Sequence, residues 1–120
     1  MDDVSLSTLH LAGDAYVCCV GGELVNQATP QVQEALDGIQ ARGGRRVIVD
    51  LCGVRLLESA GLGLLLLTSA QLQAAGGELI VVADDPRILR LFDVTGSGDR
   101  FRLERTLSEA VTSVAVRASA

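Results

Sequence analysis

The stretch Val47–Leu67, which reads VIVDLCGVRLLESAGLGLLLL, decides the fold. Its first part is dense in β-branched residues, which is typical of a buried strand. Its last part is a long apolar run that predicts a helix reaching about Ala75. Glu58-Ser59-Ala60-Gly61 lies between them, and Ser59 is predicted to be the N-cap of that helix. Because free backbone N–H groups and the helix dipole favour negative charge at such a position, it would also suit a phosphate.

The flanking segments extend this strand–helix pattern in both directions. Strands are expected at 6–11, 15–20, 46–51, 78–83 and 101–103. Helices are expected to begin near Thr29, Ser59, Asp85 and Thr106, each at a capping signal. Residues 52–57 are predicted to be a linker of strand character in which Leu56 and Leu57 are buried. The order β-β-α-β-α-β-α-β-α predicts an α/β fold, with an N-terminal hairpin followed by mainly parallel strands, covered by about four helices.

Composition limits the class of protein. The 120 residues predict one domain, 1–120, with an ordered core from about 4 to 116. The net charge of −5 and the absence of any aromatic stripe argue against nucleic acid or an anionic membrane surface as a partner. No apolar run is long enough to span a membrane, and the acidic Met1-Asp2-Asp3 start is unlike a signal peptide, so we expect a cytoplasmic location.

Catalytic and metal-binding patterns are missing from the sequence. Ser59 lacks the first glycine of a nucleophile elbow, and the only histidine, His10, falls in the opening hairpin. The chain has no lysine, no P-loop and no CxxC pair. Cys18, Cys19 and Cys52 are expected to be reduced and structural, and redox control through them is a minor alternative. The sequence therefore favours a binding or regulatory module without a cofactor, rather than an enzyme.

Four motifs in order resemble the anti-sigma factor antagonists, which are STAS-domain proteins of bacteria. They are the apolar strand 47–51, the ESAGLG segment 58–63, the GGEL segment 76–79 and the LFDVTG segment 91–96. Gly22-Glu23-Leu24 also resembles the Gly-Glu-Leu-Asp that closes the second strand of the family. Two positions depart from the family pattern: Glu58 and Val25 each stand where the family usually has Asp. The match covers nearly the whole chain at the right spacing.

The resemblance implies a function. In the family, the unphosphorylated domain binds an anti-sigma factor that is also a serine kinase, and a sigma factor is released. The kinase phosphorylates the serine after the acidic residue, binding is lost, and a phosphatase reverses the step. Ser59 would then be the phosphoacceptor, while ATP and Mg²⁺ belong to the kinase. The partner-binding positions carried over are Glu23, Val25, Asn26, Gln27, Glu58, Ala60, Gly61, Leu62 and Gly63.

Two further points stay open at this stage. The departures at Val25 and Glu58 motivate an alternative, in which the domain is a scaffold subunit of a lipid-transport ATPase or of a signalling assembly and carries no switch. The oligomeric state is expected to be a monomer or a weak homodimer.

Overall fold

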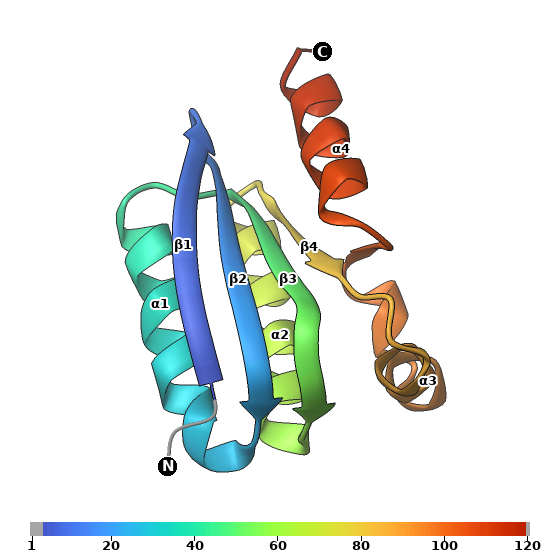
Figure 1. Ribbon diagram of the computed structural model, residues 1–120. Coiled ribbons are helices and arrows are strands. Elements are labelled where there is room, and N and C mark those ends of the chain that lie inside the picture. Colours follow the sequence, from blue (N-terminus) through green and yellow to red (C-terminus); the bar gives the residue numbers. More distant parts are fainter. Residues whose placement is uncertain (1–3, 120) are drawn as a thin grey trace.

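The computed structural model describes residues 4–119 and has the predicted order of strands and helices (Figure 1). The acidic segment Met1-Asp2-Asp3 lies outside the described residues. In chain order the elements are β1 (Val4–Ala12), β2 (Ala15–Leu24), a 3₁₀ turn (Asn26–Ala28), α1 (Thr29–Ala41), β3 (Arg46–Leu57), α2 (Ser59–Ala74), β4 (Glu78–Val82), α3 (Pro86–Thr95), a second 3₁₀ turn (Ser97–Asp99), β5 (Arg102–Glu104) and α4 (Leu107–Ser119).

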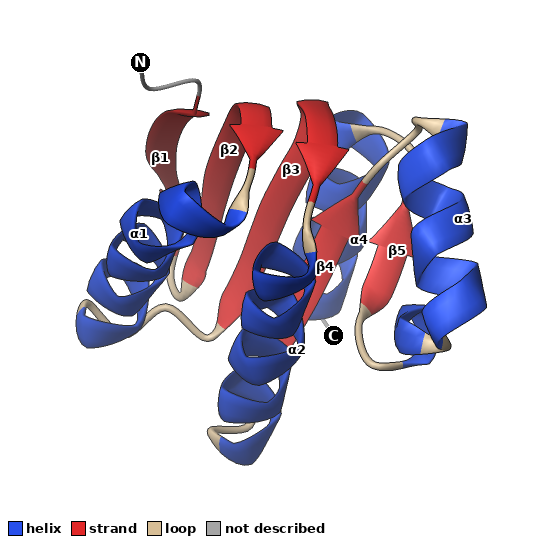
Figure 2. Cartoon of the chain, turned by 90° about the horizontal axis from the view of Figure 1, so that it is seen from below, coloured by secondary structure: helices blue, strands red, loops and turns tan. Residues whose placement is uncertain are grey.

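The strands form one mixed sheet in the order β1-β2-β3-β4-β5. β1 and β2 are an antiparallel hairpin, and each later strand joins its neighbour in parallel. Figure 2 shows α1, α2 and α3 on one side of the sheet and α4 behind it. The expected α/β class is therefore confirmed, together with its N-terminal hairpin and its parallel remainder.

Alternation along the strands divides the core into two layers. Cys18 and Val49 face the layer under α1, α2 and α3, whereas Val17 and Ile48 face the smaller layer under α4. Adjacent side chains in a strand point to opposite faces. As that rule predicts, Cys18 is buried in the larger layer, and Cys19 packs against the smaller one.

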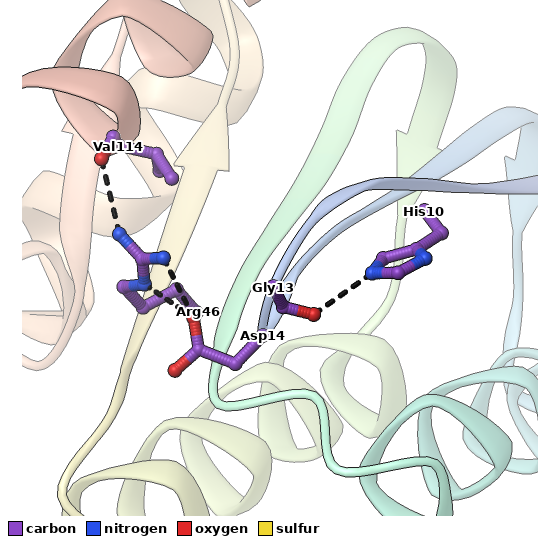
Figure 3. Close-up of polar contacts among 5 residues, drawn as sticks. All are labelled: His10, Gly13, Asp14, Arg46 and Val114. Carbon is purple, nitrogen blue, oxygen red and sulfur yellow. Dashed lines mark hydrogen bonds and ion pairs between the residues drawn. The ribbon is translucent and has the colours of Figure 1, made fainter. Parts of the chain in front are cut away.

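A half-buried arginine, Arg46, connects α4 to the sheet (Figure 3). The Arg46 guanidinium lies 2.6 Å from the carboxylate of Asp14 and donates a hydrogen bond of 3.0 Å to the carbonyl of Val114 in α4. The Asp14 carbonyl also accepts the backbone N–H of Arg46 at 3.1 Å. One arginine thus joins the hairpin turn, the central strand and the last helix.

β3 is one continuous strand of twelve residues, which corrects the expected linker at 52–57. Its second half pairs with the end of β2 through an irregular register, Gly22 with Val54 and Glu23 with Leu56. Leu57 is buried as expected, but Leu56 is 43 % exposed, so its predicted burial was wrong. The cause is alternation: once the segment is a strand, neighbouring side chains must point to opposite faces.

The parallel arrangement places the loops that follow β2 and β3 side by side. Because β2 and β3 are parallel, their C-terminal ends lie at the same end of the sheet. The backbone N–H of Glu58 donates to the carbonyl of Leu24 at 3.1 Å. The segment 25–28 therefore meets the start of α2. Nearly all the site residues predicted from the sequence lie at this C-terminal end of the strands.

Candidate functional site

The start of α2 differs in detail from the prediction. Ser59 is the first helical residue, and the N-cap is Glu58, with extended backbone angles of φ −95° and ψ 172°. The expected capping role of Ser59 is therefore wrong. Its side chain is exposed, and its hydroxyl makes no hydrogen bond within the part of the chain that the structure describes. The hydroxyl is therefore accessible both to a modifying enzyme and to a protein partner.

The cap of α2 comes from the neighbouring loop. The side-chain carbonyl oxygen of Asn26 accepts the backbone N–H of Ala60 at 3.2 Å. In return, the carboxylate of Glu58 accepts the backbone N–H of Asn26 at 2.7 Å. We call these two hydrogen bonds the Asn26–Glu58 bracket. They satisfy one free N–H at the start of each of two helical segments, as a capping box does within one helix.

The outward face of α2 is small and apolar. Ser59, Gly63 and Leu67 are four residues apart, so they share one side of the helix, and all three are exposed. Leu67 is 48 % exposed, and the sixteen residues of α2 carry no charge. A helix that is apolar on every side is usually covered on every side. We refer to Ser59, Gly63 and Leu67 as the α2 stripe.

The two glycines near Ser59 have different uses. A Cβ on Gly61 would lie 2.7 Å from Leu57 Cδ1 and 3.0 Å from Leu24 Cγ, so Gly61 lets the helix start approach the strand ends. A Cβ on Gly63 would have no atom of the described residues within 4 Å. Packing within this chain therefore explains Gly61 and leaves Gly63 without a structural reason to be glycine.

The remaining predicted site residues divide by exposure. Gln27 is exposed, and Glu23 and Ala60 are half-buried beside the bracket. Leu62 is buried, and Val25 packs against the larger core layer, so both face mainly inward. The predicted site residues therefore all lie near the C-terminal ends of β2 and β3, but only some of them are exposed to solvent. Leu67 was missed as a site residue because apolar residues in a helix are expected to face the core.

Two of the three thiols, Cys18 and Cys52, have raised pKa values. Partial burial, together with the carboxylates of Asp50 and Asp84, raises the pKa of the Cys52 thiol to about 12. Burial and the neighbouring Cys19 raise the pKa of Cys18 to about 11. Because the thiolate is the reactive form, both groups are poor redox sensors at neutral pH. The geometry gives no support to redox control.

Within residues 4–119, no group of three or more His, Cys, Asp or Glu side chains is placed to hold a metal ion. Over the same residues, no helix is long and apolar enough to cross a membrane.

Comparison with known proteins now decides the family. The STAS domain model matches residues 9–110. The anti-sigma-B factor antagonist of Staphylococcus epidermidis is 37 % identical over 86 residues, which are 72 % of this chain and 80 % of that protein. The chain belongs to the STAS-domain family of anti-sigma factor antagonists.

Solved structures of the family agree with this fold. The crystal structure of an anti-sigma factor antagonist from Mycobacterium paratuberculosis superposes with a TM-score of 0.80 at 32 % identity, covering 92 % of this chain and 94 % of that one. The anti-sigma factor antagonist SpoIIAA in its unphosphorylated form gives a TM-score of 0.79 at 22 % identity, covering 92 % and 96 %. The second likeness is one of fold alone.

Proposed function

We propose that this STAS domain is an anti-sigma factor antagonist whose unphosphorylated form binds an anti-sigma factor kinase, and that phosphorylation of Ser59 ends the binding. The domain contributes a surface and a phosphoacceptor, and the kinase brings ATP and Mg²⁺. One observation carries the proposal. The Ser59 side chain is exposed at the N-terminal end of the uncharged α2 stripe, and its hydroxyl has no hydrogen-bond partner among residues 4–119.

The stripe suits a protein partner. An uncharged helix face with an exposed leucine loses little on desolvation and buries apolar area when a partner covers it. Gly63 lets a partner's backbone come close to α2, because no side chain projects there. Names of relatives add support, since the Staphylococcus epidermidis protein is called an antagonist of an anti-sigma-B factor.

Phosphorylation would change this surface more than the fold. A phosphate adds about −1.5 to −2 charges at neutral pH, at the first residue of α2, where the helix dipole tolerates negative charge. The same charge, pressed against a fitted apolar partner surface, would have to be desolvated. A loss of about 100-fold in affinity corresponds to about 2.8 kcal/mol, which a single buried charge can supply.

The test uses paired aspartate substitutions. We expect Ser59→Asp to weaken binding to the kinase-type anti-sigma factor of the same genome by about 100-fold, and to shift the melting temperature by less than about 2 °C. Ser108→Asp is the matched control, because Ser108 is an exposed serine in the first turn of α4, which packs on the opposite face of the sheet. Equal affinities of the two variants would refute the proposal.

A phosphorylation assay tests the other half of the proposal. With ATP, Mg²⁺ and that anti-sigma factor, mass spectrometry should place one phosphate on Ser59, and Ser59→Ala should abolish it. Phosphate on another serine, with Ser59 unmodified, would contradict the assignment. A phosphatase that restores binding would complete the cycle.

A further inference from the structure

The two edges of the sheet are protected to different degrees. β5 closes one edge with only three residues, and two of them, Arg102 and Glu104, form an ion pair of 3.3 Å. β1 forms the other edge with nine residues, VSLSTLHLA, which include no proline and no Asp, Glu, Lys or Arg. Short length and charge are the usual means by which edge strands avoid pairing with another chain. β5 has both, and β1 has neither.

The β1 edge is open as well as uncharged. Most of its side chains are exposed, and Leu9 is 60 % exposed. β1 and α1 run in the same direction (Figure 1). A hollow of about 760 Å³ lies between them, and it is lined by Leu6 and Thr8 of the strand, by one side of α1 between Pro30 and Gly38, and by Arg42, which follows the helix. The strand thus offers its backbone edge, an exposed leucine and an adjoining recess.

The end of β1 is held firmly in place. The His10 ring stacks on Tyr16 with its centroid 4.4 Å away, and its Nε2 lies 2.8 Å from the carbonyl of Gly13 (Figure 3). A strand that is already ordered loses little conformational entropy when another strand pairs with it.

We propose that β1 pairs antiparallel with β1 of a second copy of this chain, about a two-fold axis near Thr8. Such an interface is isologous, so one self-complementary strand is sufficient. In this register Thr8 lies opposite its own copy, Ser7 opposite Leu9 of the second copy, and Leu6 opposite His10 of the second copy. Residues opposite each other share a face, so each exposed Leu9 is covered across the axis.

Charges beside the strand favour a second copy as the occupant. Glu34 and Arg42 line the same hollow, with Gly38 between them, and neither has an ion-pair partner in the described part of the chain. In the second copy the two-fold axis reverses the direction of β1. Because α1 runs in the same direction as β1, the α1 helix of the second copy is reversed as well. Glu34 of each copy then faces Arg42 of the other, which gives two symmetric ion pairs across an otherwise uncharged junction.

The dimer leaves the α2 stripe accessible. β1 is separated from β3 by β2, and α1 lies between the β1 edge and α2 (Figure 2). One strand and one helix face bury less than the roughly 800 Å² per partner of a stable complex, so the dimer is weak and depends on concentration. This inference does not depend on the proposed role of Ser59.

Sedimentation velocity on the full chain, from about 5 µM to 1 mM, tests the proposal. The unsubstituted protein should shift from monomer to dimer within this range. Leu9→Lys should weaken the dimer about tenfold or more by placing like charges near the axis. Val94→Lys is the matched control, because Val94 is a 72 % exposed apolar residue on α3, and it should leave the dimer unchanged.

A charge swap tests the register. Glu34→Arg and Arg42→Glu should each weaken the dimer about fivefold to tenfold, and the double variant should restore it. A protein that stays monomeric to 1 mM would overturn the proposal. So would a dimer that Leu9→Lys leaves intact, or single charge reversals that the double variant fails to rescue.

Discussion

Replacement of Asn26 by alanine tests the bracket that builds the site. The substitution removes the acceptor for the Ala60 N–H while the backbone N–H of Asn26 can still reach Glu58. Loss of a capping side chain costs about 1 kcal/mol. With an unfolding entropy of about 2.1 cal/mol/K per residue, this 120-residue chain has about 0.25 kcal/mol/K, so the melting temperature should fall by about 4 °C.

Differential scanning calorimetry and urea unfolding measure the effect, and Gln27→Ala is the matched control. Gln27 is the next residue of the same turn and is exposed, with no side-chain hydrogen bond within residues 4–119, so its loss should stay within about 0.5 kcal/mol. Glu58→Ala should cost about as much as Asn26→Ala. Because both bonds hold the same loop contact, the double variant should lose at least about 0.5 kcal/mol less than the sum. An Asn26→Ala cost no larger than that of Gln27→Ala would refute the reasoning.

Three further predictions follow from particular contacts. Gly61→Ala should destabilise the fold by about 1–3 kcal/mol, because its Cβ would lie 2.7 Å from a leucine methyl carbon, whereas Gly63→Ala should stabilise it by about 0.5–1 kcal/mol in urea unfolding, because its Cβ meets nothing; equal effects would contradict the packing argument. Cys52, with its pKa raised to about 12, should alkylate with iodoacetamide at least about tenfold more slowly than an ordinary thiol at pH 8, and Asp50→Asn should speed the reaction; a rate equal to that of an ordinary thiol, or one that Asp50→Asn leaves unchanged, would contradict this prediction. The Asp85 carboxylate pairs with the guanidinium of Arg87 and also accepts the backbone N–H of Arg87 at 2.8 Å, which together lower the pKa of that carboxyl. The stabilisation that the ionised Asp85 gives to the fold is present above the pKa of an unfolded aspartate and is lost as pH falls through the folded pKa. The unfolding free energies of the unsubstituted protein and of Asp85→Asn should therefore converge at acid pH. A difference between them that stays constant from pH 7 to pH 2 would contradict this prediction.

The sequence predicted the fold well because its signals are local. Apolar periodicity and capping signals such as Asp85 before Pro86 act within a few residues, and the structure confirms the order of strands and helices. Asp85 is the N-cap of α3, with its side chain bonded to the N–H of Arg87. The side chain of Thr106 likewise accepts the N–H of Glu109 at 3.1 Å, as the capping-box spacing predicts.

The two capping errors have different causes: a distant segment caps α2, and a preceding 3₁₀ turn runs directly into α1. Ser59 was predicted to cap α2, but the side chain that accepts the N–H of Ala60 comes from Asn26, thirty-four residues before Ala60 in the chain. Thr29 was predicted to cap α1, but the preceding 3₁₀ turn runs into the helix, and the Thr29 hydroxyl donates to the carbonyl of Val25 at 3.3 Å instead. Rules that consider one helix at a time cannot find a cap that only the parallel pairing of β2 and β3 brings near.

The two departures from the family pattern can be understood from the same contacts. The longer side chain of Glu58 reaches the N–H of Asn26, so this carboxylate holds the loop in addition to placing charge beside Ser59. Val25 packs into the core, and its carbonyl accepts the N–H of Ala28 at 2.9 Å, which starts the turn that carries Asn26. Both residues therefore support the site from within. The proposed partner surface is the α2 stripe, and a phosphate on Ser59 would lie at its N-terminal end, where it would change the surface that a partner contacts without breaking a hydrogen bond of the fold.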